Sequence, residues 1–444
     1  MSGAPELDVL ESPKELDDAS ALTDYQLRRV NSVLERALAG DFYRRKLAGL
    51  PARVRSLEEF RSFPTTVKRE VLADVEAHPP FGSRARLRPG QLRQVVTTSG
   101  TTGVGQEVYA LDAEDEAATY VMEARGFRWA GVDASSVVLN TLPMTTTAAG
   151  QWYYHGLRLL RAVILPVGTF PTERKVDYLL RFSADTIVGT PSYVYRLAEA
   201  AREARLEPAR LGVRRLGMAG ESWALEWMQD LARAWGAKPF EQYGCTQRAL
   251  AWNCPRGAVP EGGRGVLHSL PDHGLYEVVD PASGEPVGPG QFGELVITPF
   301  LANASPLVRF ATGDRVQVAA ECGCGRPGIG LVSGRVNRYD HMVKVKGLNL
   351  WPEALDSAVF GVAGVREYQA AVRTLAGGRE VLEVEVEAET ARGRVEEDVA
   401  AAIRDVTGIG AAVRLAAPGT IAAGIRGEFT KRSRLVDRRG GKER

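Results

Sequence analysis

The chain of 444 residues contains only four cysteines, and it has no apolar run long enough to cross a membrane. The scarcity of cysteine excludes a disulfide framework. An excess of charge of one sign is also lacking, because 56 lysines and arginines stand against 55 aspartates and glutamates. We therefore expect no general attraction to nucleic acid or to a membrane surface. The first 22 residues are polar and acidic rather than signal-like, which favours a cytoplasmic protein.

Hydrophobic residues make up 44% of the chain, which is enough for a large core divided over two or three domains. Short β-branched runs alternate with longer amphipathic stretches and predict strands at residues 136–140, 163–167, 186–190 and 213–218. This alternation is typical of crossover units around largely parallel sheets. Beyond about residue 340, strict alternation at 381–386 and a helical stripe at 395–406 predict a small α+β domain.

The segment with the strongest chemical signal is rich in hydroxyls and glycines and reads Thr97-Thr98-Ser99-Gly100-Thr101-Thr102-Gly103. Glycines let backbone N–H groups turn toward an anion, and the hydroxyls add donors, so the segment predicts a phosphate cradle. The alternative is a polar surface turn. A P-loop NTPase is disfavoured, because Val104-Gly105-Gln106 follows in place of the Gly-Lys-Ser/Thr ending.

This loop resembles the phosphate loop of the adenylate-forming enzymes, the superfamily of acyl-CoA synthetases, adenylation domains and luciferases. Further motifs of that superfamily follow in the same order, namely Tyr243-Gly244-Cys245-Thr246-Gln247, Phe310-Ala311-Thr312-Gly313-Asp314, Gly334-Arg335, Asp340, Lys346-Gly347-Leu348-Asn349 and Lys431. The chain looks most similar to the phenylacetate–CoA ligase branch, over nearly its whole length. That branch includes many acid-activating enzymes of bacterial secondary metabolism, so the resemblance leaves the substrate open.

The resemblance implies an α/β fold with a large N-terminal domain of mixed, mostly parallel sheets at residues 1–339. It implies a small, mobile α+β C-terminal domain at residues 340–444. The expected activity is ATP-dependent activation of a carboxylic acid, aromatic or short acyl, as an acyl-adenylate. Transfer to the thiol of CoA or of a carrier protein then releases AMP. Three alternatives remain: transfer of AMP to a cofactor or hydroxyl, an amide-forming ligase, and a nucleotide-binding homologue with impaired catalysis. We expect a monomer or homodimer.

The resemblance also assigns roles to individual residues. The expected nucleotide-binding residues are Thr98, Ser99, Gly100, Thr101, Thr102, Gly103, Gly220, Glu221, Tyr243, Gly244, Thr246, Gln247, Asp314 and Arg335. Among these, the ring of Tyr243 lies near adenine, and the carboxylate of Asp314 accepts hydrogen bonds from both ribose hydroxyls. Lys431, Thr246 and Arg335 are the expected catalytic residues, and Asp340 is the expected hinge. Lys431 bridges the carboxylate and the α-phosphate.

One position departs from the family pattern, because the signature glutamate is Gln247 here. In the family that carboxylate helps to hold the Mg²⁺ that neutralises ATP. An amide oxygen can coordinate Mg²⁺ but brings no charge, so we expect weaker metal binding. Glu221 and Glu241 are the candidates for compensation.

The candidate acid pocket comprises Met144, Tyr153, Tyr154, Tyr193 and Ala219. The aromatic residues from Trp152 to Tyr154 suit a flat ring, although an aromatic cluster serves equally well as core. His155 is either a polar pocket group or a satisfied helix residue.

The cysteines form a second constellation, in which Cys322 and Cys324 share one turn while Cys254 and His268 come from another segment. Three thiolates and an imidazole suit tetrahedral zinc, and related proteins carry such a set in these places, so we expect a structural Zn²⁺ site. The alternative is four reduced thiols. His273 is the reserve ligand, and Cys245 is expected to be a packing residue.

Overall fold

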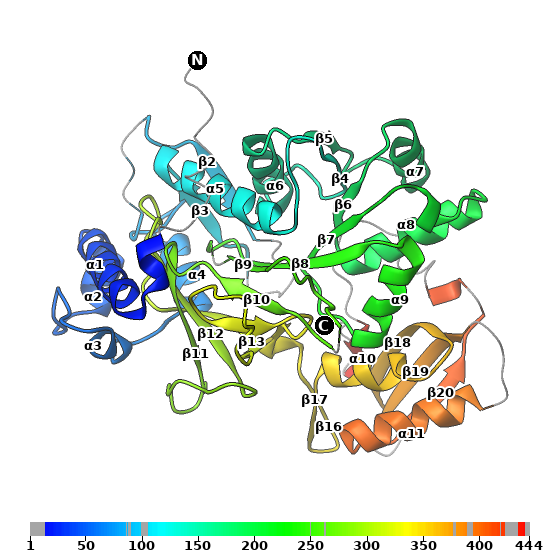
Figure 1. Ribbon diagram of the computed structural model, residues 1–444. Coiled ribbons are helices and arrows are strands. Elements are labelled where there is room, and N and C mark those ends of the chain that lie inside the picture. The colour runs from blue at the N-terminus through cyan, green and yellow to red at the C-terminus, as the bar shows by residue number, and fades with distance from the viewer. Residues whose placement is uncertain are drawn as a thin grey trace. The chain divides into compact units, whose positions relative to one another are not determined.

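A computed structural model of the chain describes residues 14–85, 87, 90–98, 105–248, 250–261, 263–375, 379–388, 394–417, 419–421 and 434–439 (Figure 1). The chain divides into two compact units, which we call the large unit and the small unit. The large unit comprises Met1–Gly220 and Ala234–Val336, and the small unit comprises Glu221–Arg233 and Asn337–Arg444. None of the helices in these ranges is both long and apolar enough to cross a membrane.

The described helices of the large unit are η2 (Lys14–Asp17), α1 (Ala19–Leu38), α2 (Asp41–Lys46), α3 (Leu57–Arg61), α4 (Lys68–Ala77), α5 (Ala113–Trp129), α6 (Ala148–Leu159), α7 (Thr172–Arg181), α8 (Pro191–Glu203) and η3 (Pro208–Arg210). Its strands are β1 (Thr66–Val67), β2 (Gln94–Thr97), β3 (Val108–Leu111), β4 (Val137–Asn140), β5 (Val163–Pro166), β6 (Thr186–Gly189), β7 (Arg215–Ala219), β8 (Lys238–Gly244), β9 (Leu250–Asn253), β10 (Val266–Ser269), β11 (Gly274–Val279), β12 (Phe292–Pro299), β13 (Phe310–Gln317) and β14 (Gly330–Val332). Helix α9 (Leu225–Trp235) runs through the segment at which the division falls.

The small unit contains β15 (Asn337–Arg338), η4 (Tyr339–His341), β16 (Val343–Val345), β17 (Leu348–Leu350), α10 (Pro352–Phe360), β18 (Val365–Thr374), β19 (Glu380–Ala388), α11 (Val395–Thr407), β20 (Ala411–Leu415) and β21 (Leu435–Asp437). Its main sheet has the order β20-β19-β18-β21. Along β19, Leu382, Val384 and Val386 are fully buried while the glutamates between them are partly exposed, as the alternating sequence predicts.

The large unit is built on an eight-stranded sheet with the order β14-β10-β9-β8-β7-β6-β4-β5. The four strands predicted from β-branched runs are its β4 to β7, so the mixed α/β class is confirmed. Parallel pairing in this sheet is confined to β5-β4-β6-β7-β8, whereas β8, β9, β10 and β14 pair antiparallel. The sheet is therefore mixed, with four parallel and three antiparallel strand pairs.

The direction of the chain reverses within the parallel part of this sheet. It moves from β4 outward to the edge strand β5, then returns past β4 to β6, β7 and β8. Right-handed crossovers therefore place α6 on the opposite face from α7 and α8. The carboxyl ends of β4 and β6 flank this reversal, and such a topological switch point is where open α/β sheets bind ligands.

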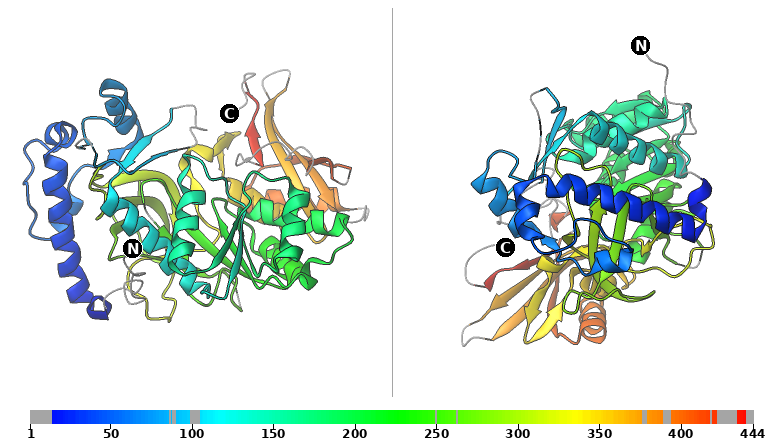
Figure 2. Two further views of the ribbon diagram at one scale, coloured as in Figure 1. Left: turned by 90° about the horizontal axis from the view of Figure 1, so that it is seen from above. Right: turned by 90° about the vertical axis from the view of Figure 1, so that its left-hand side faces the viewer.

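A second sheet in the large unit has the order β1-β13-β12-β11. Helix α1 lies across β11 and β12 (Figure 2). Its buried residues Val30, Val33 and Leu34 share one hydrophobic cluster with Leu275 of β11. The spacing of these residues places them on one face of the helix, which explains why this polar N-terminal segment folds against the sheet.

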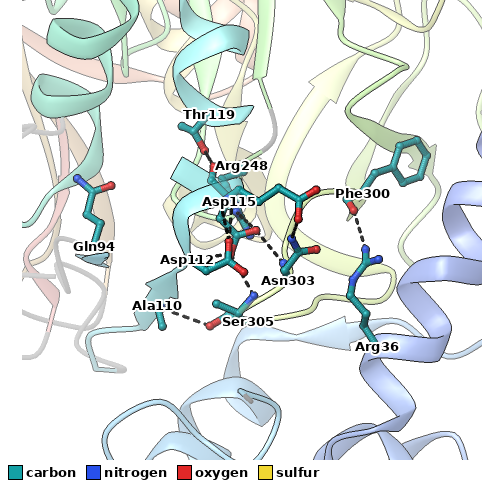
Figure 3. A network of polar contacts seen from close by, with 12 residues as sticks. Arg36, Gln94, Ala110, Asp112, Asp115, Thr119, Arg248, Phe300, Asn303 and Ser305 are labelled. Atoms are coloured by element: carbon teal, nitrogen blue, oxygen red, sulfur yellow. Dashed lines mark hydrogen bonds and ion pairs between the residues drawn. The ribbon is translucent and has the colours of Figure 1, made fainter. Parts of the chain in front are cut away.

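Asp115 ties the start of α5 to two other segments (Figure 3). Its carboxylate accepts the backbone N–H groups of Asn303 and Ala304 at 2.8 and 3.0 Å. One of its oxygens also lies 3.0 Å from Nη1 of Arg248, and both side chains are buried. Arg248 directly follows the Tyr-Gly-Cys-Thr-Gln motif, so this ion pair fixes the end of the motif against α5.

We predict that Asp115→Ala lowers the free energy of unfolding by about 3–5 kcal/mol, because the guanidinium of Arg248 is left buried without its partner. Urea denaturation measures the change. The matched control is Glu114→Ala, which removes an exposed carboxylate from the same helical turn and should cost less than about 1 kcal/mol. Equal stability losses in the two variants would contradict the assignment.

Candidate functional site

Two of the motifs meet at a buried hydrogen bond in the large unit. The hydroxyl of Tyr243, at the carboxyl end of β8, donates to Oδ2 of Asp314 on β13 at 2.6 Å. Burial, together with the nearby Asp314 carboxylate, raises the pKa of Tyr243 well above its usual value, so the hydroxyl remains a donor. The structure therefore places the residues expected at adenine and at ribose side by side.

The segment expected to cradle phosphate starts from a β-hairpin formed by β2 and β3, which pair antiparallel from Thr97 with Val108 onward. Thr98 closes this pairing, because its N–H donates to the carbonyl of Glu107 and its hydroxyl accepts the Glu107 N–H. Ser99, Gly100, Thr101, Thr102 and Gly103 lie outside the described residues.

Gln247 contacts a carboxylate. Its Nε2 donates to Oε2 of Glu107 at 2.7 Å and to the hydroxyl of Tyr109 at 3.0 Å. Oε1 of Glu107 lies 3.2 Å from Nζ of Lys68, and the Glu107 carboxylate is almost completely buried. Sequence analysis did not identify Glu107. The sequence did contain a signal for it. Glu107 is a charged residue that directly precedes the apolar residues of β3, and it lies only four positions after the glycine-rich loop.

Of the two carboxylates considered as compensation for Gln247, Glu241 accepts the backbone N–H of Gly334 at 2.7 Å, and Glu221 belongs to the small unit. The contact with Gly334 brings β8 next to the Gly334-Arg335 motif, where Arg335 is half-buried. Glu107 is therefore the carboxylate that contacts Gln247 directly.

The remaining expected residues are placed as follows. Gly220 ends the first part of the large unit with φ of +86°, a conformation that L residues with a side chain rarely adopt. Gly244 is exposed and Thr246 half-buried, in the stretch where β8 ends and the turn toward β9 begins. Asp340 lies in η4 of the small unit, where Arg338 donates to both of its oxygens. Lys431 lies outside the described residues.

The candidate acid-pocket residues fall into two groups. Tyr153 and Ala219 belong to one hydrophobic cluster between α5, α6 and the eight-stranded sheet. Tyr193 lies instead at the start of α8, where its hydroxyl contacts Thr172 and the ammonium of Lys175 sits 4.4 Å from the centre of its ring.

Two further candidates lie at the margin of that cluster. Met144, in the loop after β4, is 40% exposed. Tyr154 is half-buried on α6, and its ring packs edge-on against His155. His155 stacks on Tyr120 at 4.4 Å, and burial lowers the pKa of His155. These contacts explain His155 as a helix residue with packing partners of its own.

The four expected metal ligands converge. The ligand atoms of Cys254, His268, Cys322 and Cys324 all lie within 4.8 Å of one another. Cys254 follows β9, His268 stands on the adjacent strand β10, and the two remaining cysteines lie in the turn after β13. Among the described residues the group does not include His273, which is buried beside Asp272. Cys245 packs against a hydrophobic cluster, as expected.

The spacing of these ligand atoms fits tetrahedral zinc. Zn–S and Zn–N bonds of about 2.3 and 2.0 Å place two sulfurs about 3.8 Å apart, and a sulfur and a nitrogen about 3.5 Å apart. In the structure, the sulfurs of Cys254 and Cys322 are 3.8 Å apart, and Nε2 of His268 lies 3.5 Å from the Cys324 sulfur. Burial lowers the pKa of His268 to about 4, so its ring is neutral and retains a lone pair for a metal.

Two family models match the chain. Residues 47–299 match the model described as AMP-binding enzyme, and residues 347–439 match the model described as AMP-binding enzyme C-terminal domain. Two phenylacetate-coenzyme A ligases are similar over almost their full lengths. The ligase of Thermus thermophilus is 31% identical over 98% of this chain and 99% of its own. The ligase of Pseudomonas putida is 27% identical over 93% and 94%.

Among solved structures, 2-hydroxyisobutyryl-CoA ligase in its postadenylation state, in complex with R3-HIB-AMP, superposes with a TM-score of 0.82. It is 25% identical, and the match covers 94% of this chain and 89% of that chain. An open conformation of the same ligase, in complex with 2-HIB-AMP and CoA, superposes with a TM-score of 0.69 at 25% identity. That match covers 94% of this chain and 92% of the other.

Proposed function

Because the chain belongs to the AMP-binding enzyme family, we propose that it is an AMP-forming acid–CoA ligase. The enzyme uses ATP to convert a carboxylic acid into an acyl-adenylate and then transfers the acyl group to CoA. The single observation that supports this most directly is the buried contact between Tyr243 and Asp314, which joins two nucleotide motifs from different sheets. The phenylacetate-coenzyme A ligases that resemble the chain over 93% or more of its length support the same reaction.

In the proposed site, the carboxylate of Asp314 accepts the ribose hydroxyls of ATP, and the ring of Tyr243 lies against adenine. The hydrogen bond from Tyr243 fixes the orientation of the Asp314 carboxylate before the nucleotide arrives. A group held in place beforehand loses less conformational entropy when it binds. The loop between β2 and β3 receives the phosphates through its backbone N–H groups and hydroxyls.

The chemical step joins two anions, because the carboxylate of the acid attacks the α-phosphate and displaces pyrophosphate. Lys431 is the proposed catalytic residue, since its ammonium offsets the charge that accumulates between these groups. Thr246 and Arg335 assist at the phosphates. Rotation of the small unit about Asp340 then withdraws Lys431 and admits the thiol of CoA.

We propose that Gln247 and Glu107 together provide the oxygen atoms near Mg²⁺, which neutralises phosphate charge when it is bound. Both side chains offer hard oxygen ligands of the kind that Mg²⁺ prefers. The carboxylate of Glu107 contacts the amide of Gln247, so it supplies the negative charge that the amide lacks. Lys68, on the other side of Glu107, keeps this carboxylate in place.

A structural Zn²⁺ held by Cys254, His268, Cys322 and Cys324 is the second metal that we propose. A closed set of four protein ligands leaves no position for a reacting group, so the role of this ion is to stabilise the fold. It would connect the ends of β9 and β10 to the turn after β13.

The decisive test of the function is an acid screen that follows pyrophosphate exchange and the formation of AMP and acyl-CoA. We expect at least one aryl or short acyl acid to support both. Lys431→Ala should abolish exchange while ATP still binds, because the lysine acts on the transition state rather than on nucleotide docking. The matched control is Lys344→Ala, which removes another lysine of the small unit. Exchange without any acid would instead identify an AMP transferase, and ATP binding without exchange an impaired homologue.

The role of Glu107 predicts a change in metal dependence. Glu107→Gln should raise the Mg²⁺ concentration needed for half-maximal ATP binding by about tenfold, because one negative charge near a divalent ion is removed. Isothermal titration with ATP and no acid measures this shift independently of turnover. Adding Gln247→Glu to that variant should restore the original dependence, and Glu116→Gln on α5 should leave it unchanged. A shift that the second substitution fails to reverse would count against a charge relation between the two positions.

The purified protein should contain close to one zinc per chain by elemental analysis. Cys322→Ser should lose the metal and lower the melting temperature, because metal binding contributes several kcal/mol to folding. Cys245→Ser is the matched control and should retain the zinc, since Cys245 lies outside the four-residue group. Metal-free protein with four reactive thiols, prepared without a chelator, would refute the site.

A further inference from the structure

A layer of packed aromatic rings, which we call the aromatic layer, lies between helices α5 and α6 and the eight-stranded sheet. It consists of Phe127 on α5, Tyr153 on α6 and Trp252 on β9, whose ring centres are 4.8 to 6.1 Å apart. Ala219, at the carboxyl end of β7, packs against the same cluster. The aromatic layer therefore reaches the end of the sheet at which the acid is expected to bind.

A carboxyl group is buried beside this apolar layer, although packing between aromatic rings gives no reason for a carboxyl group there. Glu123 projects from α5 and is 1% exposed. Both of its oxygens accept from a single donor, the Nε2 of Gln242 on β8, at 3.1 and 2.8 Å. Burial raises the pKa of Glu123 well above its usual value, which favours the protonated form with an O–H to donate. A buried carboxyl has more hydrogen-bonding capacity than one amide can fill.

Two further polar groups of the aromatic layer are buried without a hydrogen-bond partner, namely the hydroxyl of Tyr153 and Nε1 of Trp252. Burial raises the pKa of Tyr153, and the nearby Glu123 raises it further. A Cβ atom added at Gly156 of α6 would lie 2.6 Å from the Cβ of Glu123, so α5 and α6 pack closely at this point. Buried polar atoms are paired in the great majority of cases, so two unpaired atoms within one cluster require an explanation.

The strand beneath this layer, β7, is partly exposed at its small residues. Strand β7 is hydrogen-bonded on both sides, yet Gly217 and Ala219 are only half-buried. A Cβ atom at Gly217 would lie 3.9 Å from the ring of Phe127, so Gly217 faces the aromatic layer. Residues two apart share a face of a strand, and Ala219 is paired with Gln242. The two partly exposed small residues therefore lie on the same face of the sheet as Gln242, which is itself buried where it meets Glu123.

We propose that Glu123, Gln242 and Tyr153 form a recognition site for a neutral hydroxyl or amino substituent on the acid substrate. Such a group both donates and accepts hydrogen bonds, which matches a phenol without a hydrogen-bond partner and a carboxyl whose partner is the single amide of Gln242. The rest of the acid is a flat ring that lies against the aromatic layer and over Gly217 and Ala219, with its own carboxylate directed toward the nucleotide motif that begins at Tyr243. This inference rests on the proposed function and assigns its substrate class.

The chemistry of the site selects against other substituents. An alkyl or halogen group of similar size fills the same space but gives the Tyr153 hydroxyl no partner and adds none to the Glu123 carboxyl beyond Gln242. A site that hydrogen-bonds a substrate hydroxyl or amine rejects analogues lacking it more strongly than an apolar pocket discriminates by size. A second carboxylate on the substrate would add a charge beside a buried acid and is also disfavoured.

The experiment measures acid-dependent pyrophosphate exchange with benzoic and phenylacetic acids that carry hydroxyl, amino, methyl or fluoro groups at each ring position. We expect a hydroxyl- or amino-bearing acid to exceed its methyl analogue at least tenfold in kcat/KM. Tyr153→Phe removes one oxygen atom, and Glu123→Gln retains shape without the carboxyl. Each variant should lower that preference at least fivefold, while the affinity for ATP stays within twofold of the parent.

Matched controls are Tyr178→Phe on α7 and Glu116→Gln on α5, which remove a hydroxyl and a carboxyl outside the aromatic layer and should retain the preference. Exchange that does not distinguish hydroxyl or amino groups from methyl groups overturns this inference and leaves the proposed function intact. Exchange with no acid in this panel or in the wider screen overturns both. If Tyr153→Phe keeps the preference while folding and binding ATP normally, the site is not where we place it.

Discussion

Buried polar contacts hold the turn that follows β8, and the arrangement of the nucleotide motifs in the large unit depends on them. Tyr243 reaches β13, Gln247 reaches the segment before β3, and Arg248 reaches the N-terminus of α5. Each partner belongs to a different part of the large unit, so residues 243–248 are held by contacts with three separate segments. In a low-dielectric interior such contacts are costly to break singly, because the partner then remains buried and unsatisfied. The turn is thereby fixed before any nucleotide binds, which is the condition for precise electrostatic catalysis.

In the same turn, Gln247 stands where the family pattern has a glutamate, and it contacts the carboxylate of Glu107. The negative charge at this position can come from the motif's own side chain or from a side chain of the neighbouring β2–β3 hairpin, provided that these two side chains are in contact. Here the hairpin contributes Glu107, and Lys68 from α4 holds its other oxygen. The hairpin also carries the loop expected to receive the phosphates. The proposed charge and the loop expected to receive the phosphates therefore belong to one hairpin, and the cation partner of Glu107 comes from α4.

Local sequence was sufficient for part of this architecture and not for the rest. Strands β4 to β7 were predicted because β-branched runs end at Gly, Pro or Thr, and these are local signals. The antiparallel pairing of β8 to β10 depends on contacts between distant segments and was missed, as was the contact of Glu107 with Gln247, 140 positions away. The convergence of Cys254 with Cys322 was expected because three thiolates and an imidazole suit tetrahedral zinc and because the proteins that the chain resembles carry such a set in these places. Whether zinc occupies the group remains a prediction. The role of Lys431 rests on the resemblance, and that of the glycine-rich loop rests on its composition together with the resemblance.

Two buried glutamates show how surroundings, rather than residue type, decide what a carboxyl group does. Glu107 meets a lysine, an amide and a phenol, so its negative charge is fully accommodated. Among the described residues, Glu123 has the amide of Gln242 as its hydrogen-bond partner, and burial raises its pKa and so favours its protonated form. Replacing such a group with an apolar side chain of similar size would ordinarily stabilise a core. A protein that retains it gives up stability at that position, and stability is most often given up where a binding site needs it. That reasoning assigns the first carboxyl to the nucleotide end of the large unit and the second to the selection of the acid.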